Sequence, residues 1–133
     1  MSFLLGLSCR GCGRLVAAEP KSFCPDCYAP LEPTYDYPAL RKSITRRTWE
    51  ARPANLWRYR ELLPLNGEPA AALPVGFTPL LPARNLGRAL GHRALCIKND
   101  AVNFPTLSFK DRVVAVALNK AIEFGFDTIA CSS

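Results

Sequence analysis

The sequence predicts an α/β protein in three parts: a zinc ribbon with four cysteine ligands (1–34), a proline-rich wrapping arm with short helices (35–83) and the start of a parallel-sheet domain (84–133). Three observations carry this prediction. Two Cys-x-x-Cys pairs lie near the N-terminus, nine prolines fall between residues 28 and 83, and strand-like and helix-like patterns alternate from residue 94 onward. The final TIACSS resembles a strand cut within a motif, so we expect a truncated domain and a chain that is an N-terminal fragment.

The first part contains two cysteine pairs separated by eleven residues: Cys9 with Cys12, and Cys24 with Cys27. A Cys-x-x-Cys turn brings two thiolates onto one ion, and two such turns complete a tetrahedral zinc site. Disulfides or unligated thiols are the alternatives. Because all four positions would be cysteine, the zinc would have no open position for catalysis and would be structural. The other cysteines, Cys96 and Cys131, have small or apolar neighbours, which predicts buried thiols.

The second part carries too many prolines for a continuous helix or a central strand. We expect one short helix in PALRKSITRRTWEA, starting at Pro38, and another in LWRYRELLP, ended by Pro64. Trp57 and Tyr59 should pack this arm against the rest of the protein. Stacking on nucleic-acid bases is the alternative role for these aromatic residues, since they alternate with Arg58 and Arg60.

The third part shows a strand, a helix and a second strand in succession, which favours a parallel sheet. RALCIK and DTIACSS are the strand-like segments, and SFKDRVVAVALNKAIEFG is the helical one. Ser108 suits the N-cap, Asp111 approximates a capping box, and Gly125 is a good stop signal. Its broad apolar stripe predicts a helix that is largely buried against the sheet.

The net charge of +6 is concentrated in one stretch of the arm. Seven positive residues fall between Arg41 and Arg60, where Glu50 is the only acid. A solvated helix face is the favoured interpretation, and a patch for an anionic substrate, a nucleic acid or a partner is the alternative. The sequence has neither a run of 18 apolar residues nor a secretory signal pattern, so we expect no membrane span and a cytoplasmic protein.

Lys110 lies in the first turn of the predicted helix of the third part. The unpaired N–H groups and the dipole at a helix start disfavour a protonated amine. In an enclosed site, desolvation would favour the neutral amine further, and a neutral amine can form a Schiff base with an aldehyde cofactor. A surface ion pair of Lys110 with Asp111 or Glu123 is the simpler alternative, and position alone does not decide between them.

The segment NDAVNFPTLSFKDRVVAVAL, followed by GFDTIACSS, resembles the pyridoxal-phosphate lysine region of the threonine synthases, within the tryptophan-synthase-β-like (fold type II) enzymes. LWRYRELLPL and GFTPLLPARNLGRALG precede it in the family's order, and some threonine synthases begin with a cysteine zinc ribbon. The resemblance implies that Lys110 binds pyridoxal phosphate covalently and that Phe109 packs beside the cofactor ring. It also implies a small-molecule substrate, O-phosphohomoserine, which is converted with water into threonine and phosphate, and a full-length protein that forms a homodimer.

The sequence departs from the commoner family pattern at two positions before this lysine. Phe104 separates Asn103 from Pro105, and Leu107 replaces a glycine. Asn103 therefore has no assigned cofactor role. The Thr-Gly-Asn turn and the glycine-rich phosphate cradle of the family do not occur in these 133 residues, so we expect this chain alone to be inactive.

Two other functions remain as alternatives. A related pyridoxal-phosphate enzyme, such as a serine or threonine dehydratase or cysteate synthase, would use a similar lysine motif. A zinc-ribbon module with a basic arm would bind nucleic acid, with an affinity that falls steeply with salt. The second alternative does not explain the strand, lysine-headed helix and strand order, so we expect no nucleic acid as a partner.

Overall fold

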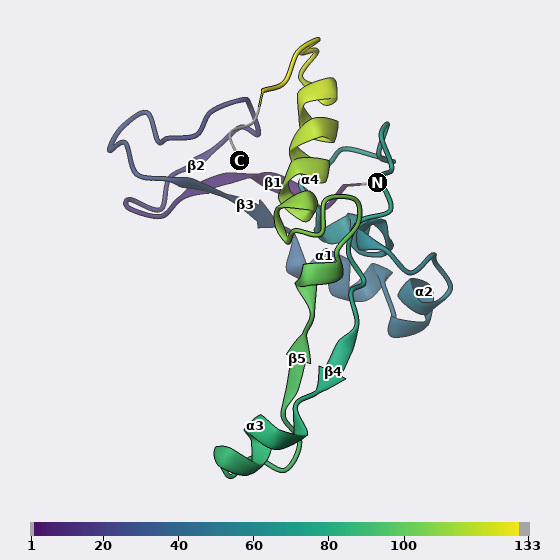
Figure 1. Cartoon of the computed structure of the whole chain (residues 1–133). Coiled ribbons are helices and arrows are strands. Elements are labelled where there is room, and N and C mark those ends of the chain that lie inside the picture. Colours follow the sequence, from purple (N-terminus) through teal and green to yellow (C-terminus); the bar gives the residue numbers. More distant parts are fainter. Residues whose placement is uncertain (1, 131–133) are drawn as a thin grey trace.

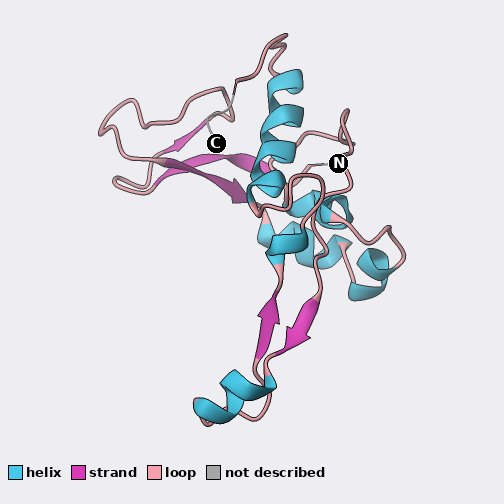
Figure 2. Ribbon diagram, in the orientation of Figure 1, coloured by secondary structure: helices cyan, strands magenta, loops and turns pink. Residues whose placement is uncertain are grey.

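The computed structural model describes residues 2–130 as a mixed α/β arrangement (Figures 1 and 2). Its strands are β1 (Leu4–Cys9), β2 (Leu15–Val16), β3 (Leu31–Tyr35), β4 (Leu80–Pro82) and β5 (Cys96–Lys98). Its helices are α1 (Tyr37–Ser43), α2 (Arg46–Glu50), α3 (Arg84–Ala89) and α4 (Lys110–Glu123), with 3₁₀ turns η1 (Leu56–Leu62) and η2 (Asp100–Val102). Within residues 2–130, no helix is long and apolar enough to cross a membrane.

The N-terminal sheet has the strand order β2-β1-β3, and both pairings are antiparallel. Leu7 faces Val16 on one side and Pro33 on the other, so β1 is the central strand. Pro33 lies on the edge strand β3, where a missing backbone N–H can be tolerated. The turns that leave and re-enter this small sheet carry the cysteine pairs.

The arm forms two short helices where the sequence suggested one. The chain leaves the helical conformation at Ile44 and Thr45, and both residues are extended. The Thr45 hydroxyl accepts a hydrogen bond from the N–H of Thr48, and the Thr48 hydroxyl accepts one from the N–H of Thr45. This reciprocal capping box starts a new helix, so the prediction of a continuous helix from Pro38 is wrong. The second predicted helix is present as η1 and ends at Leu62, two residues before the predicted stop at Pro64.

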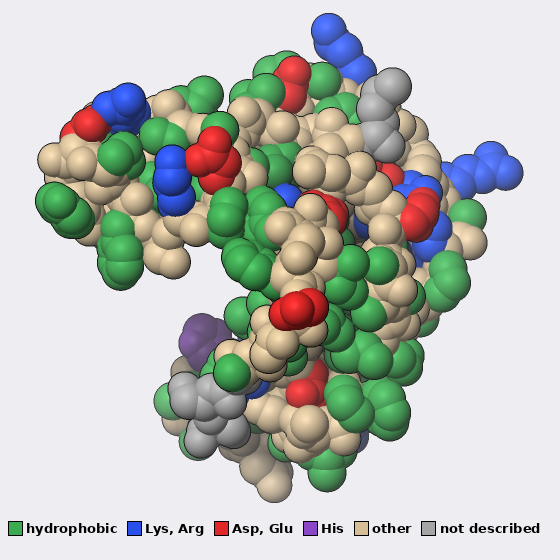
Figure 3. Space-filling view, turned by 90° about the horizontal axis from the view of Figure 1, so that it is seen from above, with side chains coloured by type: hydrophobic (Ala, Val, Ile, Leu, Met, Phe, Trp, Pro, Cys, Tyr) green, Lys and Arg blue, Asp and Glu red, His purple; other side chains and the backbone are tan. Residues whose placement is uncertain are grey.

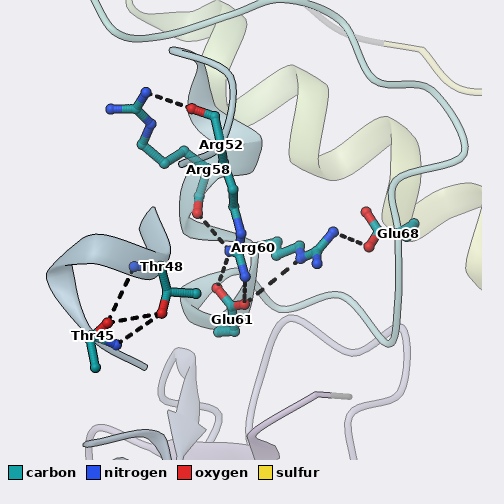
Figure 4. Close-up of polar contacts among 7 residues, drawn as sticks. All are labelled: Thr45, Thr48, Arg52, Arg58, Arg60, Glu61 and Glu68. Carbon is teal, nitrogen blue, oxygen red and sulfur yellow. Dashed lines mark hydrogen bonds and ion pairs between the residues drawn. The ribbon is translucent and has the colours of Figure 1, made fainter. Parts of the chain in front are cut away.

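Arginines of the arm are used largely inside the arm itself (Figure 4). Arg52 makes a two-pronged contact with Glu61, at 2.5 and 2.8 Å, and both side chains are mostly buried. Arg58 donates to the carbonyl of Arg52 and lies over the ring of Phe77. The ion pairs Arg46–Glu50 and Arg60–Glu68 engage two more of the seven positive residues. These contacts link η1 to the segment that follows α2.

The buried apolar cluster consists of Trp57, Leu65, Val75 and Ala115. The Trp57 indole N–H donates to the carbonyl of Leu73 at 2.7 Å, which satisfies its polar atom inside the cluster. Trp57 packs with Ala115 of α4, in agreement with the prediction that it holds the arm to the rest of the protein, whereas its hydrogen bond to Leu73 lies within the arm. Tyr59 instead packs edge-on against Trp49, within the arm.

Helix α4 buries the opposite face to the one that the sequence predicts. Its buried residues are Asp111, Ala115 and Asn119, spaced four apart, while Val113 is 68% exposed and Ile122 is 45% exposed. Many other large hydrophobic side chains are exposed, and hydrophobic groups are spread over the face shown in Figure 3. The expectation of an apolar stripe buried on a sheet is therefore wrong for the described residues. The buried side of α4 faces an extended segment, residues 66–76, which we call the strap. Some backbone groups of the strap have no partner in a helix or sheet and need polar side chains.

Strand β5 occurs where predicted but pairs antiparallel with β4, with Leu81 opposite Ile97. Residues 127–130 form no strand, and the rest of the predicted final strand, including Cys131, lies outside the described residues. No parallel pairing occurs within residues 2–130. Cys96 is exposed rather than buried, because β4 and β5 form a hairpin that projects away from α4 (Figure 1).

The Arg52–Glu61 pair generates a pH-dependent stability prediction. The hydrogen bonds from Arg52 lower the pKa of Glu61 from 4.5 to about 2. A depressed carboxyl pKa stabilises the fold above the unfolded value, and the contribution is lost as the pH falls from 4.5 towards 2. We expect Glu61→Gln to lower the free energy of unfolding at pH 7 by roughly 2 kcal/mol. In denaturant titrations this difference should shrink across that pH window.

The matched control is Glu50→Gln, which removes the exposed ion pair with Arg46 on the same arm. Exposed pairs of this kind contribute about 0.5 kcal/mol or less. Equal losses of stability in the two variants, or a Glu61→Gln effect that stays constant down to pH 2, would contradict the prediction.

Candidate functional site

The four cysteines of the ribbon converge on one point. Their sulfur atoms all lie within 4.8 Å of one another, and all four thiols are free of disulfides. The Sγ atoms of Cys9 and Cys27 are 3.4 Å apart, and those of Cys12 and Cys24 are 3.7 Å apart. A tetrahedral zinc with bonds of about 2.3 Å requires ligand separations of roughly 3.8 Å. Disulfide bonds would require about 2.05 Å, so the geometry fits a metal better than the disulfide alternative.

Backbone N–H groups in the first cysteine turn favour a thiolate at Cys9. The N–H groups of Gly11 and Cys12 point at the Cys9 sulfur, at 3.3 and 3.4 Å. The Cys12 N–H is the main cause that lowers the pKa of Cys9, which falls to about 6. Gly11 has a steric role, because a Cβ there would lie 2.8 Å from that of Ala29 and 3.3 Å from the Cys27 sulfur. The sequence therefore builds a tight, donor-lined turn that suits a metal ion.

Lys110 is the first residue of α4 and is exposed. Its Nζ makes no hydrogen bond or ion pair with any residue in 2–130. Phe109 precedes it at the N-cap position and is 61% exposed. An unpaired amine with an exposed aromatic ring next to it fits a group that needs a free lysine and a flat ring to pack against. The described residues do not enclose this amine, so they do not supply the desolvation that a neutral lysine would require.

The acidic neighbour of Lys110 is occupied elsewhere. Asp111 accepts hydrogen bonds from the Thr106 hydroxyl at 2.6 Å and from the Thr106 N–H at 3.0 Å. The hydroxyl bond is the main cause that lowers the pKa of Asp111. Ser108 does accept the Lys110 N–H, at 3.3 Å, but Asp111 does not complete a capping box with it. The capping-box prediction is therefore wrong, and Asp111 instead fastens the loop in front of the helix.

The second predicted partner of Lys110 is also engaged. Glu123 receives the Lys120 amine at 2.7 Å and the N–H of Asn66 at 2.9 Å. It lies at the far end of the 14-residue helix. The structure thus contains neither of the two surface ion pairs that offered the simpler explanation for Lys110.

Behind Lys110, the next arginine ties α4 to the β4–β5 hairpin. Arg112 donates to Asp100 at 2.6 Å and to the Thr78 hydroxyl at 3.0 Å. Thr78 donates to the same carboxylate at 2.5 Å and is the main cause that lowers the pKa of Asp100. Sequence reasoning did not single out Thr78, Asp100 or Thr106. Their only sequence signal is that each is a small polar residue next to a proline or a short turn.

Comparison with known proteins finds a family model that matches the C-terminal part of the chain. Residues 71–133 match the family model described as pyridoxal-phosphate dependent enzyme. This part of the chain is therefore similar to the pyridoxal-phosphate dependent enzymes. It contains the strap, the hairpin, the loop before Lys110 and helix α4.

Within that family, the predicted resemblance to threonine synthases is confirmed. The chain is 34% identical to the threonine synthase of Methanocaldococcus jannaschii over 126 residues, which is 94% of this chain and 31% of that protein. It is 44% identical to the threonine synthase of Halalkalibacterium halodurans over 79 residues, 59% of this chain and 22% of that protein. The chain thus spans about a third of the length of the first of these relatives. No solved structure matches it.

The loop before Lys110 contains a strained residue that can be tested. Leu107 has φ +60°, in the left-handed region that costs a side chain about 1 kcal/mol or more, and its side chain is 65% exposed. Leu107→Gly removes this strain while losing little burial. We expect it to raise the free energy of unfolding by about 0.5 kcal/mol, after the entropic cost of glycine. Thermal and denaturant unfolding measure the change.

Leu90→Gly is the control, because Leu90 is 59% exposed but has an ordinary φ of −96°. That variant should be destabilised by about 0.5–1 kcal/mol. If both glycine variants lose stability alike, Leu107 is not strained.

Proposed function

We propose that the chain is the N-terminal portion of a pyridoxal-phosphate-dependent threonine synthase. The reaction would convert O-phosphohomoserine and water into threonine and phosphate. The observation that carries the proposal is the Lys110 amine, which begins α4, has no partner within residues 2–130 and lies in the segment that matches the family. The similarity to threonine synthases supports this member of the family over the dehydratases and cysteate synthase.

In this proposal the residues of the chain have separate roles. Lys110 holds the cofactor covalently and moves protons, and Phe109 packs against its ring. Asp111 and Arg112 hold the start of α4 in place through Thr106 and Asp100. When bound, pyridoxal phosphate supplies the electron sink that lets protons leave the substrate carbon atoms. Because the chain covers 31% of its relative, we propose that residues 1–133 alone are inactive.

For the ribbon we propose a structural zinc ion on Cys9, Cys12, Cys24 and Cys27. The support is the convergence of four sulfur atoms and the two N–H groups that point at Cys9. The three units 1–34, 35–83 and 84–133 complete the proposal, with the ribbon as a stabilising module and the third unit as the start of the parallel-sheet cofactor domain. We place the protein in the cytoplasm, where the thiols stay reduced, and propose a homodimer without nucleic-acid or membrane partners.

The decisive experiment uses the protein expressed from its complete reading frame. After incubation with pyridoxal phosphate and reduction with borohydride, mass spectrometry should find a pyridoxyl adduct on Lys110. The protein should release phosphate from O-phosphohomoserine, and Lys110→Ala should lower that rate by roughly a thousandfold or more, because no other amine replaces the lysine.

Lys120→Ala, in the same helix, is the control and should keep both the adduct and the activity. A complete protein that binds no pyridoxal phosphate would refute the proposal. Binding of the cofactor without phosphate release, together with deamination of serine or threonine, would favour a dehydratase instead.

Metal analysis of the ribbon gives an independent prediction. The purified protein should contain one zinc ion per chain, and Cys24→Ser should lose it, because three thiolates and a hydroxyl bind zinc far more weakly. Cys96→Ser, which changes an exposed free thiol outside the cluster, should retain the metal. Undiminished zinc affinity in Cys24→Ser, measured by competition with a chelator, would count against the site.

A further inference from the structure

We propose that Asn103 is the positioning residue for Lys110. It would hold the loop of residues 104–109 so that the lysine is presented at the start of α4. This inference rests on the proposed role of Lys110 in binding pyridoxal phosphate. Asn103 acts on Lys110 indirectly, by holding the backbone of the loop that precedes it. The departures of the loop from the commoner family pattern left Asn103 without a role.

The side chain of Asn103 is fully buried and both ends of its amide are used. Its Oδ1 accepts the N–H of Gly76 at 2.8 Å, and its Nδ2 donates to the carbonyl of Ser108 at 2.8 Å. One side chain thereby joins the strap to the residue that lies two positions before Lys110. The asparagine amide can accept with its oxygen and donate with its nitrogen at the same time.

The backbone of Asn103 closes the same loop. Its carbonyl accepts the N–H of Leu107 at 2.8 Å, and its own N–H donates to the carbonyl of Asp100 at 3.2 Å. Asn103 is therefore bonded to residues on both sides of itself and across the loop to Ser108. Together with the Thr106–Asp111 bonds, these contacts hold both ends of the segment that precedes Lys110.

The strap partner is sterically constrained as well. Gly76 has φ +83°, and a Cβ there would lie 2.8 Å from the Arg112 guanidinium and 3.2 Å from the N of Leu56. The close approach allows its N–H to reach Asn103. A polar group buried without its bond would carry a large desolvation penalty, so the loop cannot shift without breaking these contacts. Because both amide ends already bind backbone groups, the geometry assigns Asn103 to positioning and not to direct contact with a cofactor.

Asn119, which lies in α4 as Lys110 does, provides a matched control for Asn103. It is also buried, and its amide likewise accepts from and donates to strap backbone, through the N–H of Ala71 at 2.8 Å and the carbonyl of Ala71 at 2.9 Å. It lies more than two turns beyond Lys110. Asn119→Ala should therefore cost stability of a similar kind without disturbing the loop before the lysine.

The test uses the protein from its complete reading frame, with Asn103→Asp, Asn103→Ala and Asn119→Ala as variants. Asn103→Asp keeps the acceptor for Gly76 and, when ionised, loses the donor to Ser108, whereas Asn103→Ala loses both. The rate at which pyridoxal phosphate becomes trapped on Lys110 by borohydride should fall roughly 10- to 100-fold in both Asn103 variants and little in Asn119→Ala. If Lys110 is trapped in the wild type and the Asn103 and Asn119 variants slow equally, the positioning role is refuted.

Amide hydrogen exchange without cofactor separates this inference from the proposed function. The N–H groups of Gly76 and Leu107 should be protected in the wild type, and the protection of Leu107 should fall at least about tenfold in Asn103→Asp but not in Asn119→Ala. If the wild type forms no pyridoxyl adduct, only the proposed role of Lys110 is refuted. The exchange result still tests whether Asn103 holds the loop. Unprotected Gly76 and Leu107 amides in the wild type would overturn the loop assignment. This wild-type measurement decides the question even if the Asn103 variants fail to fold.

Discussion

The strap of residues 66–76 imposes the main constraint on this structure, because it belongs to neither a helix nor a sheet and several of its backbone groups find their partners among side chains. Asn119 pairs with both polar groups of Ala71, Glu123 accepts the N–H of Asn66, and Asn103 accepts that of Gly76. On the other side, the Trp57 indole donates to the Leu73 carbonyl. The strap thus connects the arm, helix α4 and the loop before Lys110.

This polar anchoring explains the orientation of α4. Asn119 faces inward because it bonds both polar groups of Ala71 in the strap, and Ala115 joins the small apolar cluster around Trp57. Asp111 is held inward by Thr106 of the loop before the helix. Its more apolar residues, including Val113, remain at the surface. The same orientation leaves Lys110 exposed, while the adjacent Asp111 is bonded to Thr106. The acid next to Lys110 in the sequence is therefore already engaged by Thr106.

The cysteine cluster and the arginine-rich arm differ in how directly their contacts follow from residue spacing. A Cys-x-x-Cys turn is local, so two of them predict a sulfur cluster before any tertiary contact is known. The arginine-rich arm is not local in this sense. Arg52 finds Glu61 nine positions later, and Arg60 finds Glu68. The stretch from Arg41 to Arg60 contains only one acid, but its arginines pair with Glu61 and Glu68, which lie beyond it in the sequence (Figure 4). Composition alone cannot show such pairing across loops.

The sequence by itself determined the cysteine cluster, the positions of β5 and η1, helix α4 within two residues at each end, and the resemblance of the lysine segment to threonine synthases. These depend on local spacing, turn residues and motif order. Only the tertiary structure decided which face of α4 is buried, that β4 and β5 pair antiparallel, that the arm breaks at Thr45, and that Asn103 bonds Gly76 and Ser108. The physical reason is that each of these depends on competition among hydrogen-bond partners, and several of those partners lie 20 to 50 residues away.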